Sequence, residues 1–197
     1  MTVTKSPHFK SFEAYLSADP ADLPEGRYEY WDGELVAIMP ESGLNDDIAN
    51  YLYFLLVSAG IWAKLVKPHS CEVEVMGKPR TRFPDLTILD EAHVPLLKKR
   101  NTITRDMRPP RLLVEVVSPG NPDSVNYKRD YQDKAQQYAA IEVPEYWIID
   151  PDRAWVSVGV LVNGSYQFQT FTGQQMIASP TFPDLKLTVE QVLSAGR

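Results

Sequence analysis

The chain has little of several features that would define a function directly. Only one of its 197 residues is a cysteine, Cys71, so we expect neither an internal disulfide nor a thiolate metal site. No apolar run reaches the ~18–20 residues that a membrane helix needs. The N-terminal stretch lacks the basic segment and apolar segment of a secretory signal. We therefore expect a cytoplasmic protein whose metal ligands, where it has any, are oxygen or imidazole groups.

Common catalytic motifs are also missing. The sequence has no P-loop, no dinucleotide fingerprint and no Gly-x-Ser-x-Gly elbow. Its three histidines, His8, His69 and His93, are scattered without metal-ligand spacing, and we expect them at the surface. The 26 acidic and 20 basic residues give a net charge of −6. This balance argues against indiscriminate binding of a polyanion but allows a local basic surface.

What the chain does have is a hydrophobic content of 44%, enough for one folded domain over residues 1–197. Periodicity predicts helices over 11–18, 42–59, 123–141 and 188–195, and strands over 28–31, 34–38, 71–76, 83–89, 111–117, 145–150, 154–162 and 166–171. Asp32-Gly33 and Asn163-Gly164 are typical hairpin turns, and 90–110 is expected to be a loop. The order predicts a mixed α/β (α+β) fold, with a central mixed sheet flanked by helices and a β-hairpin near each terminus.

A single carboxylate, Glu115, interrupts the apolar run 112–117. Such a run is typical of a strand that is buried on both faces. Burying an ion costs several kcal/mol unless the ion is paired or holds a metal. Glu115 is therefore either the partner of an arginine at a strand edge or a functional acid, and we favour the functional interpretation.

Asp85 poses the same question at the start of the apolar strand predicted over 83–89, directly after Pro84. An aspartate at the start of a strand is common, and proline is tolerated there because its missing N–H matters least. A second acid on a neighbouring strand, however, makes a metal site shared with Glu115 the better interpretation.

Lys134 lies in a tyrosine-rich stripe of the helix predicted over 123–141. At about 100° per residue, one side of this helix carries Tyr127, Asp130, Tyr131, Lys134, Tyr138 and Ile141. The opposite side carries Arg129 and Gln136. Taken alone, the helix favours a local i,i+4 ion pair between Asp130 and Lys134. Next to two buried carboxylates, an inward-facing lysine would also have charge partners.

Two acids and a lysine have a definite chemical use. Mg²⁺ binds carboxylate oxygens and keeps several waters, so two carboxylates and a substrate phosphate suffice to hold it. The metal polarises the phosphorus–oxygen bond, and a nearby lysine orients the attacking water or stabilises charge on phosphorus. The combination predicts metal-assisted hydrolysis of a phosphodiester.

Four stretches of the sequence, 27–36, 83–86, 113–119 and 130–150, carry a resemblance to a known family. Pro84-Asp85 is followed thirty residues later by Glu115 in a hydrophobic strand. In this the chain resembles the PD-(D/E)XK nuclease superfamily and, more narrowly, the bacterial family named "putative restriction endonuclease". The resemblance covers about residues 12–162, which is most of the chain.

The resemblance implies a restriction-endonuclease-like core with Asp85 and Glu115 as ligands of Mg²⁺ (or Mn²⁺) and DNA as the substrate. The superfamily lysine normally sits two residues after the glutamate, where this chain has Val117. In this family a lysine of the following helix takes its place, and Lys134 fits. A further acid from the earlier helix often completes such sites. The candidates here are Glu41, Asp46 and Asp47, with Glu41 as first choice.

Three functions follow from these observations. The first is a Mg²⁺-dependent DNA endonuclease, for which cutting both strands of a duplex would favour a homodimer. The second is a catalytically degenerate nuclease-fold protein that binds DNA or another partner, an alternative favoured by Val117 and the acidic net charge. The third is a metal-dependent hydrolase of a smaller phosphate ester.

A basic segment is the remaining candidate for a nucleic-acid contact. Six basic residues against one acid, Asp106, give a net charge of +5 between residues 98 and 111. The basic residues are Lys98, Lys99, Arg100, Arg105, Arg108 and Arg111. The segment is either a phosphate-contacting loop or a solvated one.

Overall fold

The computed structural model describes residues 7–40, 42–118 and 125–195. Its main element is a six-stranded sheet with the order β11-β10-β9-β8-β6-β3. The strands are β3 (Val66–Pro68), β6 (Leu86–Ile88), β8 (Leu112–Val116), β9 (Glu145–Asp150), β10 (Trp155–Val162) and β11 (Ser165–Thr172). Only β8 and β9 pair in parallel, and the other neighbours are antiparallel. The sheet is therefore mixed, as the sequence predicts.

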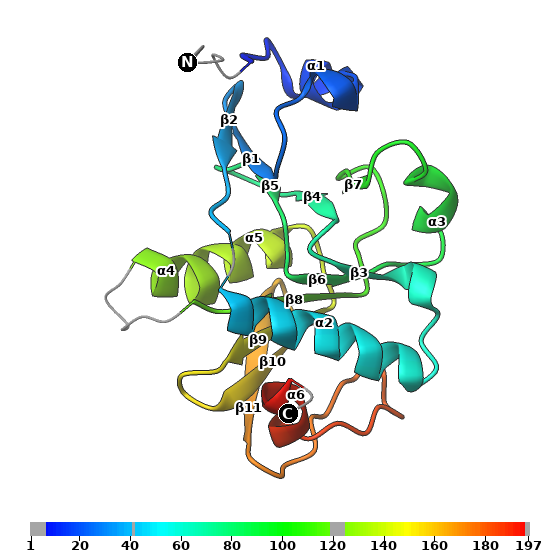
Figure 1. Cartoon of the computed structure of the whole chain (residues 1–197), viewed down its shortest axis with the longest axis vertical. Helices are drawn as coiled ribbons and strands as arrows, with labels where there is room; N and C mark the ends of the chain where they lie inside the picture. The colour runs from blue at the N-terminus through cyan, green and yellow to red at the C-terminus, as the bar shows by residue number, and fades with distance from the viewer. Residues whose placement is uncertain (1–6, 41, 119–124, 196–197) are drawn as a thin grey trace.

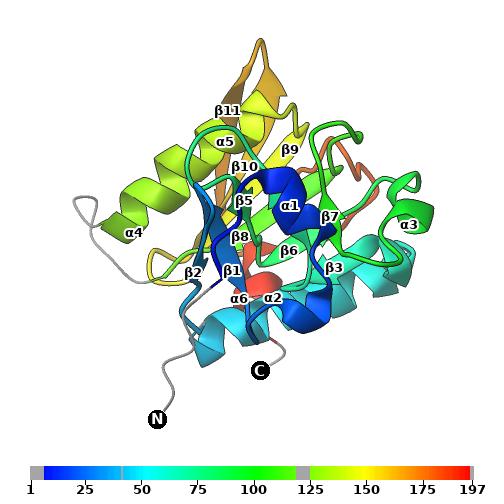
Figure 2. The same cartoon turned by 90° about the horizontal axis from the view of Figure 1, so that it is seen from above.

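Helices cover both faces of this sheet (Figures 1 and 2). On one face lie α2 (Gly43–Ser58) and the short α6 (Val189–Ser194), and on the other lie α4 (Val125–Lys128) and α5 (Lys134–Ala140). Every residue of β8 and β9 is buried between these layers, which explains why β8 is apolar apart from Glu115 and why β9 is apolar between its terminal acids, Glu145 and Asp150. Within the described ranges, no helix combines the length and apolar composition needed to cross a bilayer.

A smaller layer of N-terminal elements packs beside one end of the sheet (Figure 1). It contains α1 (Phe12–Ser17), the hairpin of β1 (Tyr28–Trp31) and β2 (Glu34–Ala37), and a three-stranded sheet. The strands of that sheet are β5 (Thr81–Arg82), β4 (Glu72–Glu74) and β7 (Thr102–Ile103), in the order β5-β4-β7. Phe12, Tyr15, Tyr30 and Leu35 form a separate hydrophobic cluster here. The end of β2 leads the chain toward the start of α2.

Local signals in the sequence explain most element boundaries. Ser42 caps α2 by accepting a hydrogen bond from the Asn45 backbone N–H, and Thr188 forms a capping box at α6. Asp32 and Asn163 adopt the left-handed conformation, with φ of 46° and 50°, as type I′ hairpin turns require. The predicted helices, both hairpins and the strand 145–150 are confirmed within a few residues, although 119–124 lie outside the described residues.

Several expectations are wrong. The segment 90–110 is not a plain loop, because it contains α3 (His93–Leu96) and β7, and the sequence analysis also missed β3 and β5. His93 is fully buried: its Nε2 lies 2.8 Å from the Arg108 carbonyl oxygen, and its Nδ1 accepts a hydrogen bond from the Asp90 backbone. The side chain of His69 is only 16% exposed. These two histidines therefore belong to the interior, and only His8 lies at the surface.

Candidate active site

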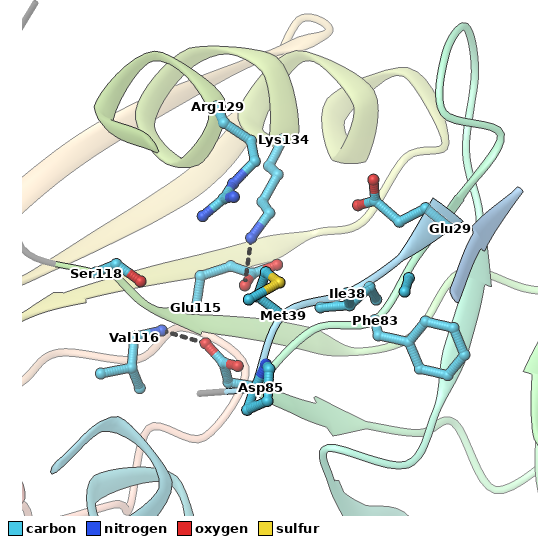
Figure 3. A pocket seen from close by; sticks show the side chains of 12 residues that line it. Glu29, Ile38, Met39, Phe83, Asp85, Glu115, Val116, Ser118, Arg129 and Lys134 are labelled. Atoms are coloured by element: carbon cyan, nitrogen blue, oxygen red, sulfur yellow. Dashed lines mark hydrogen bonds and ion pairs between the residues drawn. The ribbon is translucent and has the colours of Figure 1, made fainter. Parts of the chain in front are cut away.

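The register of two adjacent strands brings Asp85 and Glu115 together. β6 and β8 are antiparallel, with Leu86 opposite Val114, so the next residues outward are Asp85 and Glu115. Both side chains are buried, at 4% and 2% exposure. The Val116 backbone N–H donates a hydrogen bond of 2.7 Å to Asp85 Oδ2, which fixes this carboxylate beside the strand that carries Glu115 (Figure 3).

Lys134 approaches the same carboxylate from the helical layer. Its Nζ lies 2.8 Å from Glu115 Oε2 and 2.9 Å from Asp130 Oδ1, and its side chain is 12% exposed. The Tyr138 hydroxyl donates a hydrogen bond of 2.6 Å to the other oxygen of Glu115. The lysine thus fills both of the roles that the sequence left open, since it pairs with Asp130 and also faces the site.

The charges in this cluster are incompletely balanced. Burial raises the pKa of Glu115 to about 7, and the neighbouring Asp85 and Asp130 also raise it, although Lys134 opposes the shift. Burial disfavours the charge on Lys134, but Glu115 and Asp130 outweigh it and raise the lysine's pKa. Asp130 is also buried, yet Lys134 and Arg129 keep its pKa below its usual value. The site can therefore accept further positive charge next to Asp85 and Glu115.

A pocket of about 310 Å³ opens onto these groups (Figure 3). Its walls come from the N-terminal hairpin and the segment after it, from the strands that carry the acids, and from the helical layer. The lining residues are Glu29, Ala37, Ile38, Met39, Pro40, Phe83, Asp85, Glu115, Val116, Ser118, Arg129 and Lys134. The pocket lies at the end of the sheet where the small N-terminal layer meets α4 and α5.

Two charged lining residues, Glu29 and Arg129, were not among the predicted site residues. Glu29 is 18% exposed and forms a 2.6 Å ion pair with the buried Arg82. Arg82 also donates a hydrogen bond from Nε to Gln137 Oε1. Arg129 was expected on the helix face opposite Lys134, but both line the same pocket. No pattern in the sequence marks either residue, because each is brought to the pocket by a contact or turn of the folded chain.

The two predicted acids within α2, Asp46 and Asp47, do not join the pocket lining. Asp46 lies 3.2 Å from His69 Nε2, and the other ring nitrogen of His69 lies 3.6 Å from Asp85 Oδ1. Asp47 is exposed. Glu41, the first choice, lies outside the described residues. His69 thus lies between Asp46 of α2 and Asp85 of the paired acids.

The residues present fit a hard divalent cation. Among residues 7–40, 42–118 and 125–195, no group of three His, Cys, Asp or Glu side chains could hold a metal ion by itself. Mg²⁺ does not need such a cage, because it commonly binds through one or two carboxylates together with waters and substrate phosphate. Asp85 and Glu115 offer oxygen ligands of this kind, and their uncompensated charge matches a cation.

The fold is shared with a protein of known structure. It is similar to the crystal structure of a "putative nuclease belonging to DUF820" from Anabaena variabilis ATCC 29413, with a TM-score of 0.67 and 16% sequence identity. The match covers 94% of this chain and 98% of that one. No curated protein matches the chain significantly.

The family is defined more specifically by the sequence. Residues 12–190 match the model of the Uma2 family, which is described as "Putative restriction endonuclease". The chain belongs to this family. The four stretches on which the resemblance rests fall within the matched range, and so do Asp85, Glu115 and Lys134.

Proposed function

We propose that this protein is a metal-dependent DNA endonuclease, with Asp85 and Glu115 as the metal ligands and Lys134 as the residue that positions the attacking water. The observation that carries the proposal is the Lys134 ammonium, 2.8 Å from Glu115 Oε2, in a pocket that Asp85 also lines. Membership of the Uma2 family supports the same reaction class. Bound Mg²⁺ or Mn²⁺ would polarise the scissile phosphate and supply a water of lowered pKa.

The side chains of this protein have separate tasks in that reaction. Each oxygen of Glu115 accepts one hydrogen bond, from Lys134 or from Tyr138, and keeps a second lone pair for another partner. Asp85 Oδ2 accepts a hydrogen bond from the Val116 backbone N–H, whereas Asp85 Oδ1 accepts none from the strand. Lys134 cannot accept a proton in its charged form, and its raised pKa keeps it charged. It therefore acts as a hydrogen-bond donor and as a stabiliser of negative charge on the phosphate.

Three further expectations accompany the proposal. Duplex DNA is the expected partner, a homodimer would allow both strands to be cut, and the protein is expected in the cytoplasm. The alternative, a degenerate nuclease fold that binds DNA without cutting it, is favoured by Val117 at the usual position of the superfamily lysine. Cleavage separates the two functions, because the degenerate protein would bind DNA and leave it intact.

The test is cleavage of plasmid and single-stranded DNA in Mg²⁺ or Mn²⁺, and in EDTA. We expect wild-type cleavage to need the metal and Glu115→Gln to lower it by more than about 100-fold, since even the loss of an outer-shell partner of a metal costs 10–100-fold. Glu72→Gln is the matched control, because Glu72 is equally buried but lies outside the pocket. Cleavage by Glu115→Gln at the wild-type rate would overturn the proposal.

A further inference from the structure

The helix that carries Lys134 contains a π-turn at Arg129–Asp133. The Lys134 backbone N–H donates its hydrogen bond to the Arg129 carbonyl oxygen, five residues earlier. In a regular α-helix residues five apart point about 140° away from each other. The wider π-turn places residues i and i+5 on the same side. This turn explains why Arg129 and Lys134 share one pocket wall.

A buried carboxylate holds the Arg129 guanidinium in position. Its Nε and Nη2 lie 2.9 and 3.2 Å from the two oxygens of Asp130, a bidentate arrangement. Asp130 is almost completely buried, whereas the Arg129 side chain remains 38% exposed. Within the part of the chain that the structure describes, Nη1 has no hydrogen-bond partner. Figure 3 shows the guanidinium directed into the space above Glu115, beside the Lys134 ammonium.

Lys134 and Arg129 differ in the hydrogen-bond donors that they leave available for a ligand. Lys134 already bridges two carboxylates, whereas Arg129 uses one edge of its guanidinium for Asp130 and leaves donors of the other edge available. A guanidinium with fixed orientation matches the oxygens of a phosphate better than a flexible ammonium does. The opposite part of the pocket carries Asp85 and Glu115, which repel a phosphate. A polyanion would therefore enter along the helical wall.

We infer that Arg129 is a substrate-binding residue that holds a non-bridging oxygen of a phosphodiester of the nucleic-acid strand, in a position set by the π-turn and by Asp130. The inference rests on the proposed function and adds to it the site's first substrate contact. Arg129 binds the strand, while Lys134 acts at the phosphate that is cleaved.

The test compares Arg129→Gln with Lys128→Gln, which removes the same charge from the preceding, exposed residue outside the pocket lining. DNA affinity is measured against salt concentration in EDTA, in a Glu115→Gln background that cannot cut. We expect Arg129→Gln to lower the salt slope by about 0.9 on duplex DNA and about 0.7 on a single strand. Lys128→Gln should leave both slopes unchanged.

The second readout is the cleavage kinetics of Arg129 variants that keep the wild-type Glu115. Arg129→Gln should raise KM by about 10- to 100-fold, the typical value of a charge-assisted hydrogen bond, with a smaller change in kcat. Arg129→Lys keeps the charge without the planar fork and should recover part of the loss. This variant also keeps the inference testable if Arg129→Gln folds poorly. Bis(p-nitrophenyl) phosphate, a small phosphodiester, distinguishes a strand contact from a contact to the scissile group.

Each outcome bears on the inference. An unchanged rate on the small ester with a raised KM on DNA supports a contact to the strand, and an equal loss on both substrates overturns it. Equal salt slopes and KM values for Arg129→Gln and Lys128→Gln also overturn it, and leave Arg129 as a structural partner of Asp130. Wild-type protein that neither binds nor cuts DNA removes the proposed function and this inference together, whereas wild-type cleavage with an indifferent Arg129 removes the inference alone.

Discussion

Two pairs of buried acids occupy neighbouring regions of the molecule, and they are balanced in different ways. Glu72 and Glu74 lie on β4 in the small three-stranded sheet, and Asp85 and Glu115 lie at the end of the main sheet. By sequence alone the first pair is as conspicuous as the second, because each acid stands among apolar neighbours. The structure separates the pairs by the number of cations and donors that reach them.

The β4 acids are fully matched. Glu72 accepts hydrogen bonds from Tyr15, Thr102 and Arg100. Glu74 pairs with Arg80 and Arg105 and accepts a further bond from the Arg105 backbone N–H. These contacts tie α1 and the segment after α3 to β4. The acids therefore stabilise the small layer.

The acids of the main sheet have fewer partners. One ammonium, that of Lys134, serves both Glu115 and Asp130, and Asp85 has no lysine or arginine within ion-pair distance in the described structure. The comparison teaches that burial of an acid does not by itself indicate function. A shortage of cations beside a pocket is the more discriminating sign.

The largest expected effect comes from removing the shared cation. Lys134→Ala leaves two buried carboxylates without their ammonium, so we expect the free energy of unfolding to fall by about 3–5 kcal/mol and cleavage to be lost. Urea unfolding and the plasmid assay measure the two effects. In the double variant with Glu115→Gln, part of the stability should return because one of the stranded charges is gone, while cleavage stays absent.

Two outcomes would count against this role of Lys134. Normal cleavage by Lys134→Ala would reduce the lysine to the i,i+4 partner of Asp130. Lys134→Arg is the control that retains the charge, and it should fold at near wild-type stability but cut more slowly, because a guanidinium presents its donors differently from an ammonium.

Neutralising one acid should lower stability in the β4 region but not at the end of the main sheet. Glu72→Gln weakens charge-assisted hydrogen bonds from three partners, and we expect a loss of about 1–3 kcal/mol with cleavage retained. Glu115→Gln removes a buried charge that Asp85 and Asp130 repel, so the free energy of unfolding in EDTA at pH 8 should be unchanged or higher. Chemical denaturation of both variants gives the comparison. A clear loss of stability in Glu115→Gln would show that the two regions are balanced alike.

The sequence predicted the acids and the lysine because each breaks an apolar pattern of known period: Glu115 in a buried strand, Asp85 at the start of the next strand, and Lys134 in a tyrosine stripe. It did not predict Arg129, because a π-turn changes the helical period without leaving a pattern in the residues. It misplaced His93, whose burial depends on a backbone carbonyl fifteen residues away. The strands β3, β5 and β7 were missed because two or three residues carry too little periodicity to mark a strand.

Alkaline pH should lower the free energy of unfolding through buried tyrosines in both regions. Burial raises the pKa of Tyr15, and the Glu72 charge adds to the shift; burial also raises the pKa of Tyr166 in β11. A raised pKa in the folded state stabilises the fold below the unfolded value of about 10, and this contribution is lost as the pH rises above it. We expect a decline of about 1.4 kcal/mol per pH unit for each such tyrosine.

Urea unfolding at a series of pH values, with phenolate absorbance as the second signal, measures this decline. Tyr15→Phe should make the decline of the unfolding free energy with pH less steep. Tyr166→Phe, in β11 of the main sheet, should have the same effect. Phenolate absorbance of both tyrosines appearing near pH 10 while the fold is intact would contradict the prediction.

The smallest effect is expected from the basic segment 98–111, which the sequence offered as a phosphate contact. Its arginines are engaged within the fold: Arg100 with Glu72, Arg105 with Glu74, Arg108 with Asp90, and Arg111 with the Thr181 carbonyl oxygen. Figures 1 and 2 both place α3 and β7 on the side of the molecule away from α4. Arg100 and Arg105 therefore balance the β4 acids, while Arg108 and Arg111 make contacts elsewhere in the fold.

The other two basic residues of this segment, Lys98 and Lys99, are exposed. A variant with both changed to alanine removes two charges without disturbing the ion pairs of β4, so it separates a surface role from a structural one. If the strand runs along Arg129, the salt slope of DNA binding stays at the wild-type value, because neither lysine is near the pocket wall. A slope reduced by about two units would instead extend the DNA surface to this side, and the path of the strand would have to pass the small N-terminal layer.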